Sequence, residues 1–322
     1  MIKNKKIFIT GGAGFIGTKI CDVLYKNNEI LIYDNLNRNS IKDTDLLNKD
    51  TIKLIEGDIL DYKHLKLVID DFKPNIIIHL AAVAGIDTVI KNPVKTMKVN
   101  MIGTYNLLEA LVDNIENIDR FIDFSTSEVF GSYAYKVEEL STTNLAPVGE
   151  ARWTYSVSKL AGEHLAHSYY KEYGLPIVSV RPFNIYGPGQ VGEGAIHQFV
   201  NRAIRNEEIQ IHGDGDQIRS WCYVEDFVEG IMLCLENEEA IGNTFNIGNP
   251  KGTITISMLA YLIKLLSNSE SNIVNVDKNY VDVELRIPSI EKARSILKYE
   301  PKYDLSEGLK RTIEWYRGMK ND

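Results

Sequence analysis

The chain is poor in cysteine: only Cys21, Cys222 and Cys234 occur in 322 residues, and no two of them form a Cys-x-x-Cys pair. An odd number of cysteines cannot all pair within one chain, and three are too few for a disulfide framework. We therefore expect Cys21 and Cys234 to be small, reduced core side chains, as in a protein of the reducing cytosol.

Long apolar runs and targeting segments are also lacking. No run approaches the roughly 18 residues of a membrane-spanning helix. The strand-like segment that begins at Lys6 is not preceded by a signal-peptide pattern. The sequence therefore predicts a cytoplasmic protein with no membrane partner.

Basic residues are fewer than acidic ones, with 36 Lys and Arg against 44 Asp and Glu, so the formal net charge is −8. An acidic surface argues against broad binding to nucleic acid or to anionic membranes, and no nucleic-acid partner is expected. A local phosphate site is not excluded, because such a site needs only backbone N–H groups and a few arginines.

Several catalytic motifs are missing. The sequence has no His-Glu-x-x-His, no clustered metal-ligand spacing, no Walker loop and no Gly-x-Ser-x-Gly elbow. Metal hydrolases, NTPases and esterases therefore have no support, and no metal site is predicted.

Strand-like apolar runs alternate with helical patterns along the first 180 residues. The runs are continuous, as expected for strands that helices cover on both faces. They span 6–10, 29–34, 51–56, 75–79, 120–125 and 176–181, with helical patterns at 14–27, 61–72, 93–115 and 153–173. This order predicts an α/β fold with a doubly wound parallel Rossmann sheet.

After Arg181 the composition changes: glycine and proline become frequent, and the predicted helices and strands become shorter. Helices are expected near 195–206, 224–236, 255–267, 289–297 and 305–317. We predict a Rossmann domain over 1–181, which 224–248 also joins through a returning strand, and a smaller, discontinuous α/β lobe over 182–322.

The segment Thr10-Gly-Gly-Ala-Gly-Phe-Ile-Gly17 follows the first strand-like run and opens a helical pattern. Glycines at 11, 14 and 17 allow a tight turn, close approach to a pyrophosphate, and packing of the helix on the sheet. The N-terminus of that helix offers free N–H groups to phosphate. A glycine triplet in this context predicts dinucleotide binding.

Acidic residues end the next two strand-like runs. Asp34 is placed to accept hydrogen bonds from ribose hydroxyls and to repel a 2′-phosphate, which favours NAD, although Arg38 nearby leaves an opening for NADP. Asp58 either accepts from the adenine amino group or caps the helix expected from Asp61. After the fourth run, His79 is expected to be a core side chain, and the small residues beyond it allow a flat cofactor to lie against the sheet.

The decisive pattern is Tyr155-Ser-Val-Ser-Lys159, whose spacing puts the phenol and the ammonium on one helix face. A phenol with a pKa of about 10 is a poor base at neutral pH, so we expect Lys159 to lower the pKa of Tyr155. A third member is expected in Ser125-Thr-Ser-Glu-Val-Phe-Gly131, at the carboxyl edge of the sheet, where open α/β sheets bind ligands.

These segments, at 10–17, 57–59, 79–85, 125–131, 155–159 and 181–188, together resemble the extended short-chain dehydrogenase/reductase family. The resemblance is to its nucleotide-sugar epimerase, dehydratase and decarboxylase branch, and covers essentially the whole chain. It implies tightly held NAD in the domain over 1–181, a nucleotide-sugar lobe over 182–322, a nucleoside-diphosphate sugar as substrate, and a homodimer through the helices near 93–115 and 153–173. The residues expected to contact NAD are Gly11, Gly14, Phe15, Ile16, Gly17, Asp34, Asn35, Asp58, Ile59, Leu80, Ala81, Ala82, Tyr155 and Lys159.

The resemblance also implies catalytic roles. Tyr155 would remove the proton of the sugar 4-hydroxyl, Lys159 would hold the nicotinamide ribose, and Thr126 would hydrogen-bond the same sugar oxygen. NAD would accept the C4 hydride, giving a 4-keto sugar. Oxidation at C4 acidifies the C5 proton and turns a C6 carboxylate into a β-keto acid, so epimerisation, dehydration and decarboxylation share this first step.

Glu128 and Ser127 stand where the branch is decided. Thr-Ser-Glu resembles the pattern of GDP-mannose 4,6-dehydratases and of UDP-glucuronate decarboxylases, whereas simple 4-epimerases need no carboxylate there. Glu128 would abstract the C5 proton in a dehydratase or lie beside the departing carboxylate in a decarboxylase. Ser127 replaces the Asp of many dTDP-glucose dehydratases, so the strongest acid for expelling the 6-hydroxyl is missing.

Two further segments resemble UDP-glucuronate decarboxylases, namely Arg152-Trp-Thr-Tyr-Ser-Val-Ser-Lys159 and Tyr280-Val-Asp-Val-Glu-Leu-Arg-Ile-Pro-Ser-Ile290. By this resemblance Arg286 would face the sugar carboxylate or a phosphate, since its planar fork suits both. The resemblance also implies that substrate is bound by Tyr280, Asn184 and Arg219.

The sequence thus favours an NAD-dependent enzyme that oxidises C4 of a nucleotide sugar, with UDP-glucuronate-type decarboxylation ahead of NDP-hexose 4,6-dehydration and NDP-sugar 4-epimerisation. A distant alternative is a non-catalytic, dinucleotide-sensing regulator on the same fold. Such proteins often lose the Tyr or the Lys of the pair, and both are present here. The nucleotide base, the sugar and the pathway are left open.

Overall fold

The computed structural model describes residues 2–145, 147–277 and 280–319. Within these ranges the largest sheet has seven strands, all parallel, in the order β12-β7-β5-β4-β1-β2-β3. Its strands are β1 (Lys6–Thr10), β2 (Glu29–Asp34), β3 (Ile52–Glu56), β4 (Ile76–His79), β5 (Arg120–Phe124), β7 (Ile177–Pro182) and β12 (Asn243–Ile247). The predicted α/β fold is confirmed, and β12 is the returning strand at the sheet edge.

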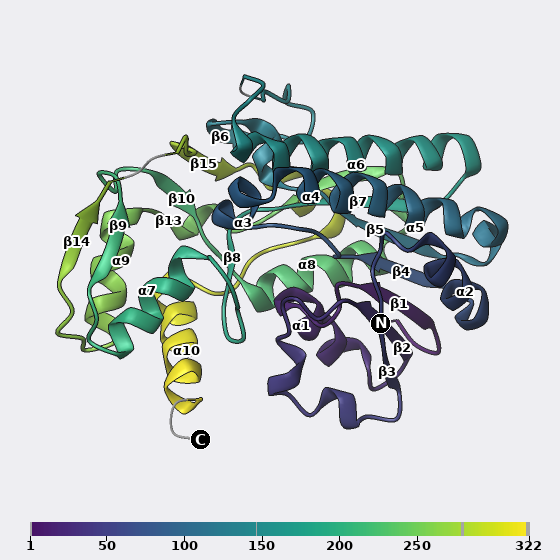
Figure 1. Ribbon diagram of the computed structural model, residues 1–322, viewed down its shortest axis with the longest axis horizontal. Helices are drawn as coiled ribbons and strands as arrows, with labels where there is room; N and C mark the ends of the chain where they lie inside the picture. The colour runs from purple at the N-terminus through teal and green to yellow at the C-terminus, as the bar shows by residue number, and fades with distance from the viewer. Residues whose placement is uncertain (1, 146, 278–279, 320–322) are drawn as a thin grey trace.

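Helices cover both faces of this sheet (Figure 1). One face carries α2 (Tyr62–Phe72), α3 (Ile86–Lys91), α4 (Pro93–Met97), α5 (Gly103–Leu111) and α6 (Ala151–Tyr173), and the other carries α1 (Phe15–Leu24) and α8 (Val224–Glu236). Strand β1 shows why its apolar run is continuous: Ile7 and Ile9 enter one buried core and Phe8 enters the other. Side chains on both faces are removed from water, which stabilises the two-sided arrangement.

The single helix predicted over 93–115 is interrupted. Between α4 and α5 the chain makes a π-helical turn (Lys98–Ile102), and a 3-10 segment (Val112–Asn117) follows. The turn carries Asn100, whose amide accepts from Val83 N at 2.8 Å, donates to Val83 O at 3.0 Å, and donates to Ser158 at 3.0 Å. The departure from regular helix therefore fixes the segment after β4 to α6, as π-turns often do at functional sites.

A smaller lobe is built on a four-stranded sheet in the order β13-β10-β15-β6. Its strands are β6 (Tyr133–Val137), β10 (Ile218–Ser220), β13 (Thr253–Thr255) and β15 (Leu285–Pro288). Two further pairs are β8 (Ile185–Tyr186) with β11 (Cys222–Tyr223), and β9 (Ile209–His212) with β14 (Ile273–Val276). β6 belongs in sequence to the first domain but pairs with β15, so the two lobes are interwoven.

The lobe's helices are α7 (Ala195–Ile204), α9 (Ile256–Leu266) and α10 (Leu305–Gly318). The helix predicted over 289–297 ends in a π-helical turn (Ala293–Leu297). Short 3-10 turns complete the chain, at Ile41–Asp43, Leu46–Asn48, Ser127–Phe130, Glu238–Ala240 and Pro250–Gly252.

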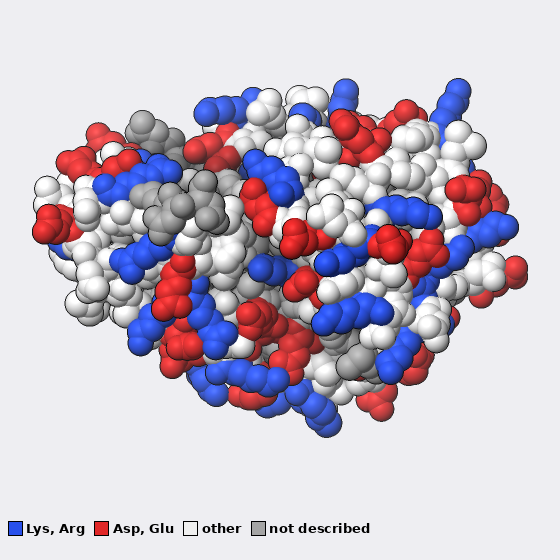
Figure 2. All heavy atoms as spheres, turned by 90° about the horizontal axis from the view of Figure 1, so that it is seen from below, with Lys and Arg blue, Asp and Glu red and all other residues white. Residues whose placement is uncertain are grey.

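Acidic and basic side chains are interspersed on the face shown in Figure 2 rather than gathered by sign. Among the described residues, no helix combines the length and apolar character needed to cross a bilayer.

Candidate active site

The glycine-rich loop lies at one end of a cleft of about 720 Å³ that runs along the carboxyl edge of the large sheet. Helix α1 begins after Gly14, which has no side chain to satisfy the first N–H groups of the helix. The cleft is lined by nearly every residue expected to contact NAD, namely Gly11, Gly14, Phe15, Ile16, Gly17, Asp34, Asn35, Ile59, Leu80, Ala81, Ala82, Tyr155 and Lys159. Its size and lining fit a dinucleotide.

Gly11 explains why the loop needs glycine. Its φ is +71°, and a Cβ there would lie 2.6 Å from the backbone nitrogen of Ala81. We expect Gly11→Ala to destabilise the fold by about 2–4 kcal/mol, from the left-handed conformation and the clash together. Gly174 has a φ of +74° and nothing within 4 Å, so Gly174→Ala is the matched control and should lose only about 1 kcal/mol. Urea unfolding measures both, and equal losses would contradict the close-approach explanation.

Asp34 ties the glycine loop to the loop after β2. Its carboxylate accepts from Ala13 N at 3.0 Å and from Leu36 N at 2.8 Å, and it is almost fully buried. Arg38 donates to Ala84 O at 2.7 Å and pairs with Glu193, so its guanidinium is directed across the cleft. Arg38 is therefore less available to bind the 2′-phosphate of NADP, which favours NAD.

Asp58 and His79, which follow or end predicted strands, lie in different surroundings. The Asp58 carboxylate accepts from Leu60 N at 2.9 Å, is exposed, and is absent from the described cleft lining, whereas Asp61 caps α2 through His64 N. His79 is fully buried, and its two ring nitrogens hydrogen-bond Thr10 and Thr104 at 2.7 and 2.9 Å. The expectation that His79 is a core side chain is confirmed.

One face of α6 supplies four polar side chains. Arg152, Tyr155, Ser156 and Lys159 are spaced at three, four and seven residues, which aligns them along the helix. Tyr155 and Lys159 line the cofactor cleft, and Arg152 and Tyr155 line a second pocket beside it. The helix is long enough to span both pockets, and it ends at Gly174 in a left-handed cap.

The net shift of the Tyr155 pKa is opposite to the lowering that was expected from Lys159. Burial first, and the Glu128 carboxylate second, raise the pKa of Tyr155 to about 12. A hydrogen bond with Thr126 and the charge of Arg286 act the other way on this pKa, but by less.

The ammonium of Lys159 interacts with two acidic side chains, Asp123 and Glu163. Burial lowers the pKa of its ammonium, while Asp123 and Glu163 oppose that effect. The i, i+4 spacing was visible in the sequence, but these two acids come from β5 and from the next turn of α6.

The second pocket has a volume of about 210 Å³ and shares Tyr155 and Thr126 with the cofactor cleft. It is also lined by Ser127, Glu128, Arg152, Asn184 and Arg286. Thr126 accepts from Glu128 N at 3.2 Å, which leaves its hydroxyl proton to donate towards a phenol or a ligand oxygen. A ligand in this pocket therefore lies against the Tyr155 phenol and beside the cofactor cleft.

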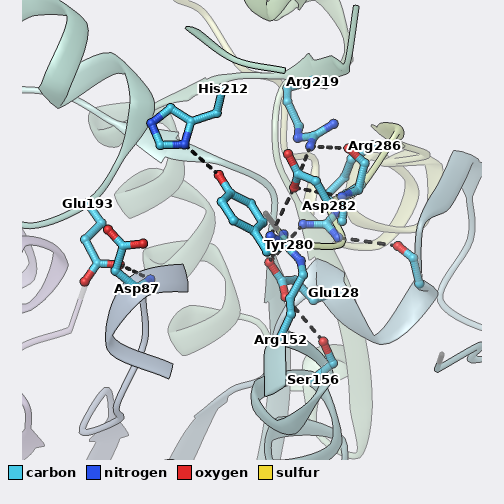
Figure 3. Close-up of polar contacts among 12 residues, drawn as sticks. Asp87, Glu128, Arg152, Ser156, Glu193, His212, Arg219, Tyr280, Asp282 and Arg286 are labelled. Atoms are coloured by element: carbon cyan, nitrogen blue, oxygen red, sulfur yellow. Dashed lines mark hydrogen bonds and ion pairs between the residues drawn. The ribbon is translucent and has the colours of Figure 1, made fainter. Parts of the chain in front are cut away.

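Charged side chains form a network along the wall of the second pocket (Figure 3). Glu128 pairs with Arg152 at 3.2 Å and Arg286 at 3.3 Å, and accepts from Ser156 at 3.3 Å. Asp282 pairs with Arg152 at 3.0 Å and Arg219 at 3.4 Å. Among the described residues of this network, three guanidiniums thus share two carboxylates, an excess of one positive charge.

Strand register explains how the arginines meet. Arg219 of β10 lies directly opposite Arg286 of the parallel strand β15, and α6 brings Arg152 to the same place. Burial would raise the pKa of Glu128, but Arg152 and Arg286 together outweigh it and the net pKa is lowered. Glu128 is therefore held ionised.

The remaining predicted substrate residues lie at different distances from this pocket. The Asn184 side chain lines it and donates to Ser220 O at 2.9 Å. Arg219 is buried behind Asp282 and donates to Val283 O. The Tyr280 hydroxyl lies 3.2 Å from His212 Nδ1, and its ring lies near the arginines in Figure 3.

Sequence reasoning gave no role to Ser156 or Asp282 and quoted Arg152 only as part of a motif. The signal for Arg152 and Ser156 was the helical spacing to Tyr155 and Lys159. Asp282 gave no local signal, because its partners are far away in the sequence. In the described part of the chain, no group of three or more His, Cys, Asp or Glu side chains could hold a metal ion.

The chain is similar in sequence to known proteins. The sequence model of the NAD dependent epimerase/dehydratase family matches residues 7–248. UDP-glucuronic acid decarboxylase 6 of Arabidopsis thaliana is 36% identical over 98% of this chain and 89% of its own. dTDP-D-glucose 4,6-dehydratase of Bos taurus is 34% identical over 97% and 89%.

A solved structure is similar over its whole length. UDP-glucuronic acid 4-epimerase of Bacillus cereus, in complex with UDP-glucuronic acid and NAD, superposes with a TM-score of 0.87 at 30% identity, covering 98% of this chain and 99% of the other. The three relatives carry three different activities, so similarity alone does not choose among them.

Proposed function

Because the chain belongs to the NAD dependent epimerase/dehydratase family, we propose that it decarboxylates a UDP-glucuronate-type nucleotide sugar after oxidising C4 of the sugar. The chain is an NAD-dependent enzyme that acts on nucleotide sugars. The proposal concerns which of the family's reactions it performs and which residues perform it.

The first step needs a base, a hydroxyl and a hydride acceptor at one place. Tyr155 and Thr126 line both the cofactor cleft and the second pocket, so a sugar in the second pocket meets them beside the cofactor. We assign Tyr155 to take the proton of the 4-hydroxyl as the phenolate, which its raised pKa makes the minor form at neutral pH, and Thr126 to hydrogen-bond the same oxygen. NAD, when bound, supplies the hydride acceptor. Lys159, at the same end of the cleft, is assigned to hold the nicotinamide ribose.

The excess guanidinium charge on the wall of the second pocket is the main support for a substrate with a carboxylate. Arg286 and Arg152 are almost fully buried and both line the pocket. Burial lowers the pKa of Arg286, so its charge is costly there, and a ligand carboxylate would add a second anionic partner beside Glu128. A neutral hexose would leave the excess charge unpaired, which favours a uronate.

Decarboxylation does not require Glu128 to act as a base. In a 4-keto uronate the C5–C6 bond breaks, its electrons pass into the enolate of the ketone, carbon dioxide leaves, and a proton from solvent adds at C5. The hydride taken from C4 then returns to C4 and Tyr155 returns the proton to its oxygen, so the product differs from the substrate only by the loss of carbon dioxide. No base is needed for the C5–C6 cleavage. Dehydration instead needs Glu128 to abstract the C5 proton, and a carboxylate with a lowered pKa that is shared by two arginines is a weak base.

A panel of substrates tests the proposal. NAD-loaded protein is incubated separately with UDP-glucuronate, UDP-N-acetylglucosamine, dTDP-glucose and GDP-mannose, and the products are analysed by mass spectrometry and NMR. We expect UDP-glucuronate to lose the mass of carbon dioxide. The proposal fails if glucuronate is returned uncleaved while a neutral hexose loses water, or if only the C4 configuration changes.

We also propose a homodimer, formed through the helices on one face of the large sheet. Exposed apolar side chains gather there, at Val94 of α4, Ile102 before α5, Tyr105 of α5 and Val157 of α6. These helices contact one another within the chain, so the side chains belong to one surface. Light scattering of the purified protein measures the assembly, and a monomer at micromolar concentration contradicts this part of the proposal.

A further inference from the structure

Three segments far apart in the sequence meet at the opening of the cofactor cleft. They are the loop after β2, which carries Arg38, the segment 84–88 after β4, and residues 187–194 before α7, here called the strap. All three contribute to the cleft lining, through Arg38, Ala84, Thr88, Gln190 and Val191. The contacts among them therefore decide how easily the cleft opens.

Glu193 of the strap is the centre of these contacts. Its carboxylate accepts from Asp87 N at 2.8 Å and from Thr88 N at 3.2 Å, and it also accepts from the Thr88 hydroxyl. Figure 3 shows Glu193 reaching the segment that carries Asp87. The carboxylate thus satisfies the first N–H groups of α3, whose own N-cap, Gly85, has no side chain to do so.

Arg38 completes the contact from the opposite side. Its guanidinium lies 3.7 Å from the Glu193 carboxylate and donates to Ala84 O at 2.7 Å. A Cβ on Gly85 would lie 2.6 Å from Glu193 Oε2 and 2.8 Å from Arg38 Nη2. A Cβ on Gly192 would lie 3.2 Å from Arg38 Cζ, so glycines allow the backbone to approach this ion pair from both segments.

The strap is also fixed to the smaller lobe, through residues just before Glu193. Gly192 O accepts from His197 at 2.8 Å and from Gln198 at 3.0 Å, both on α7, and Gln190 O accepts from Tyr316 of α10. Glu193 is therefore the point at which a strap held by one lobe engages the other. The same segment 84–88 also walls the second pocket, through Ala84 and Gly85.

We propose that Glu193 is a positioning residue whose contacts with Thr88 and Arg38 form a clasp that retains NAD. While the clasp is closed, the strap covers the cleft and the segment 84–88 stays in place between cofactor and sugar. Retention matters for a reaction of this kind, because the cofactor must remain bound while the oxidised sugar is processed. The inference holds for whichever sugar the enzyme takes, so it does not depend on decarboxylation.

The test measures cofactor exchange. Protein loaded with NAD is freed of unbound cofactor and mixed with an excess of the fluorescent etheno analogue of NAD, and the exchange rate is recorded. We expect Glu193→Ala to exchange about tenfold faster, as loss of a charge-assisted contact predicts. The exchange rate of Glu193→Gln should lie between those of the wild type and Glu193→Ala. The amide oxygen of the glutamine still accepts from the α3 N–H groups, but the neutral amide does not form an ion pair with Arg38.

Two comparisons distinguish a clasp from general destabilisation. Glu207→Ala removes an exposed Glu–Arg pair away from the cleft, with Arg205 at 4.0 Å, and should exchange at the wild-type rate. The double variant Glu193→Ala, Arg38→Ala should accelerate cofactor exchange by less than the product of the two single accelerations, because the two residues contact each other. If Glu193→Ala does not fold, Thr88→Val removes one donor at nearly constant shape and should also speed exchange. Wild-type exchange in the folded variants, or fully multiplicative effects, would overturn the clasp.

Discussion

Tyr155→Phe should lower kcat for UDP-glucuronate by about a thousandfold, the middle of the range for loss of a general base. The substitution removes only the phenol oxygen at the junction of the two pockets and leaves Thr126 and the charge network in place. We therefore expect NAD content and thermal stability to stay close to those of the wild type. Steady-state kinetics with the purified, NAD-loaded variant measure the effect.

Tyr133→Phe is the matched control, because Tyr133 is 70% exposed on β6 and lines neither pocket. Its kcat should equal that of the wild type. If Tyr155→Phe retains more than about a tenth of the wild-type kcat, the phenol does not carry the proton transfer.

Arg286→Met should lower kcat for UDP-glucuronate by about a hundredfold, as expected for losing a charge-assisted contact to the reacting carboxylate. Met retains much of the apolar stem, and Glu128 keeps Arg152 and Ser156 as partners, so the buried carboxylate is not left alone. The KM should change less than kcat, because the guanidinium acts on the carboxylate that leaves. Initial rates over a range of substrate concentrations separate the two parameters.

An exposed arginine provides the comparison for this variant. Arg294 pairs with Glu300 at 2.8 Å on the surface, and Arg294→Met should leave both kinetic parameters unchanged. A large rise in KM at unchanged kcat in Arg286→Met would mean that Arg286 holds a phosphate. In that case the charge excess in the second pocket no longer argues for a uronate.

The large sheet was predictable because its strands are signalled locally. Continuous apolar runs marked all six predicted strands to within one residue, and the glycine loop marked the cofactor cleft. The smaller sheet gave no such signal. β10 and β15 have three and four residues, too few to show a period, and each contains a buried arginine.

The sequence pointed to most of the side chains that line the two pockets, but not to their electrostatics. Spacing on α6 brought Tyr155 and Lys159 together, whereas burial and Glu128 set the direction of the Tyr155 pKa shift. The Arg286–Glu128 contact spans 158 residues in sequence and depends on the pairing of β15 with β6. Contacts of that kind come from topology, which motif spacing does not contain.

Stopped-flow mixing of NAD-loaded protein with UDP-glucuronate carrying hydrogen or deuterium at C4 tests the central claim most directly. The absorbance of reduced nicotinamide and the release of carbon dioxide are recorded together. The account predicts that reduced nicotinamide forms first, more slowly with deuterium, and that carbon dioxide follows. Carbon dioxide released without reduced nicotinamide, or an intact uronate inverted at C4, would contradict it.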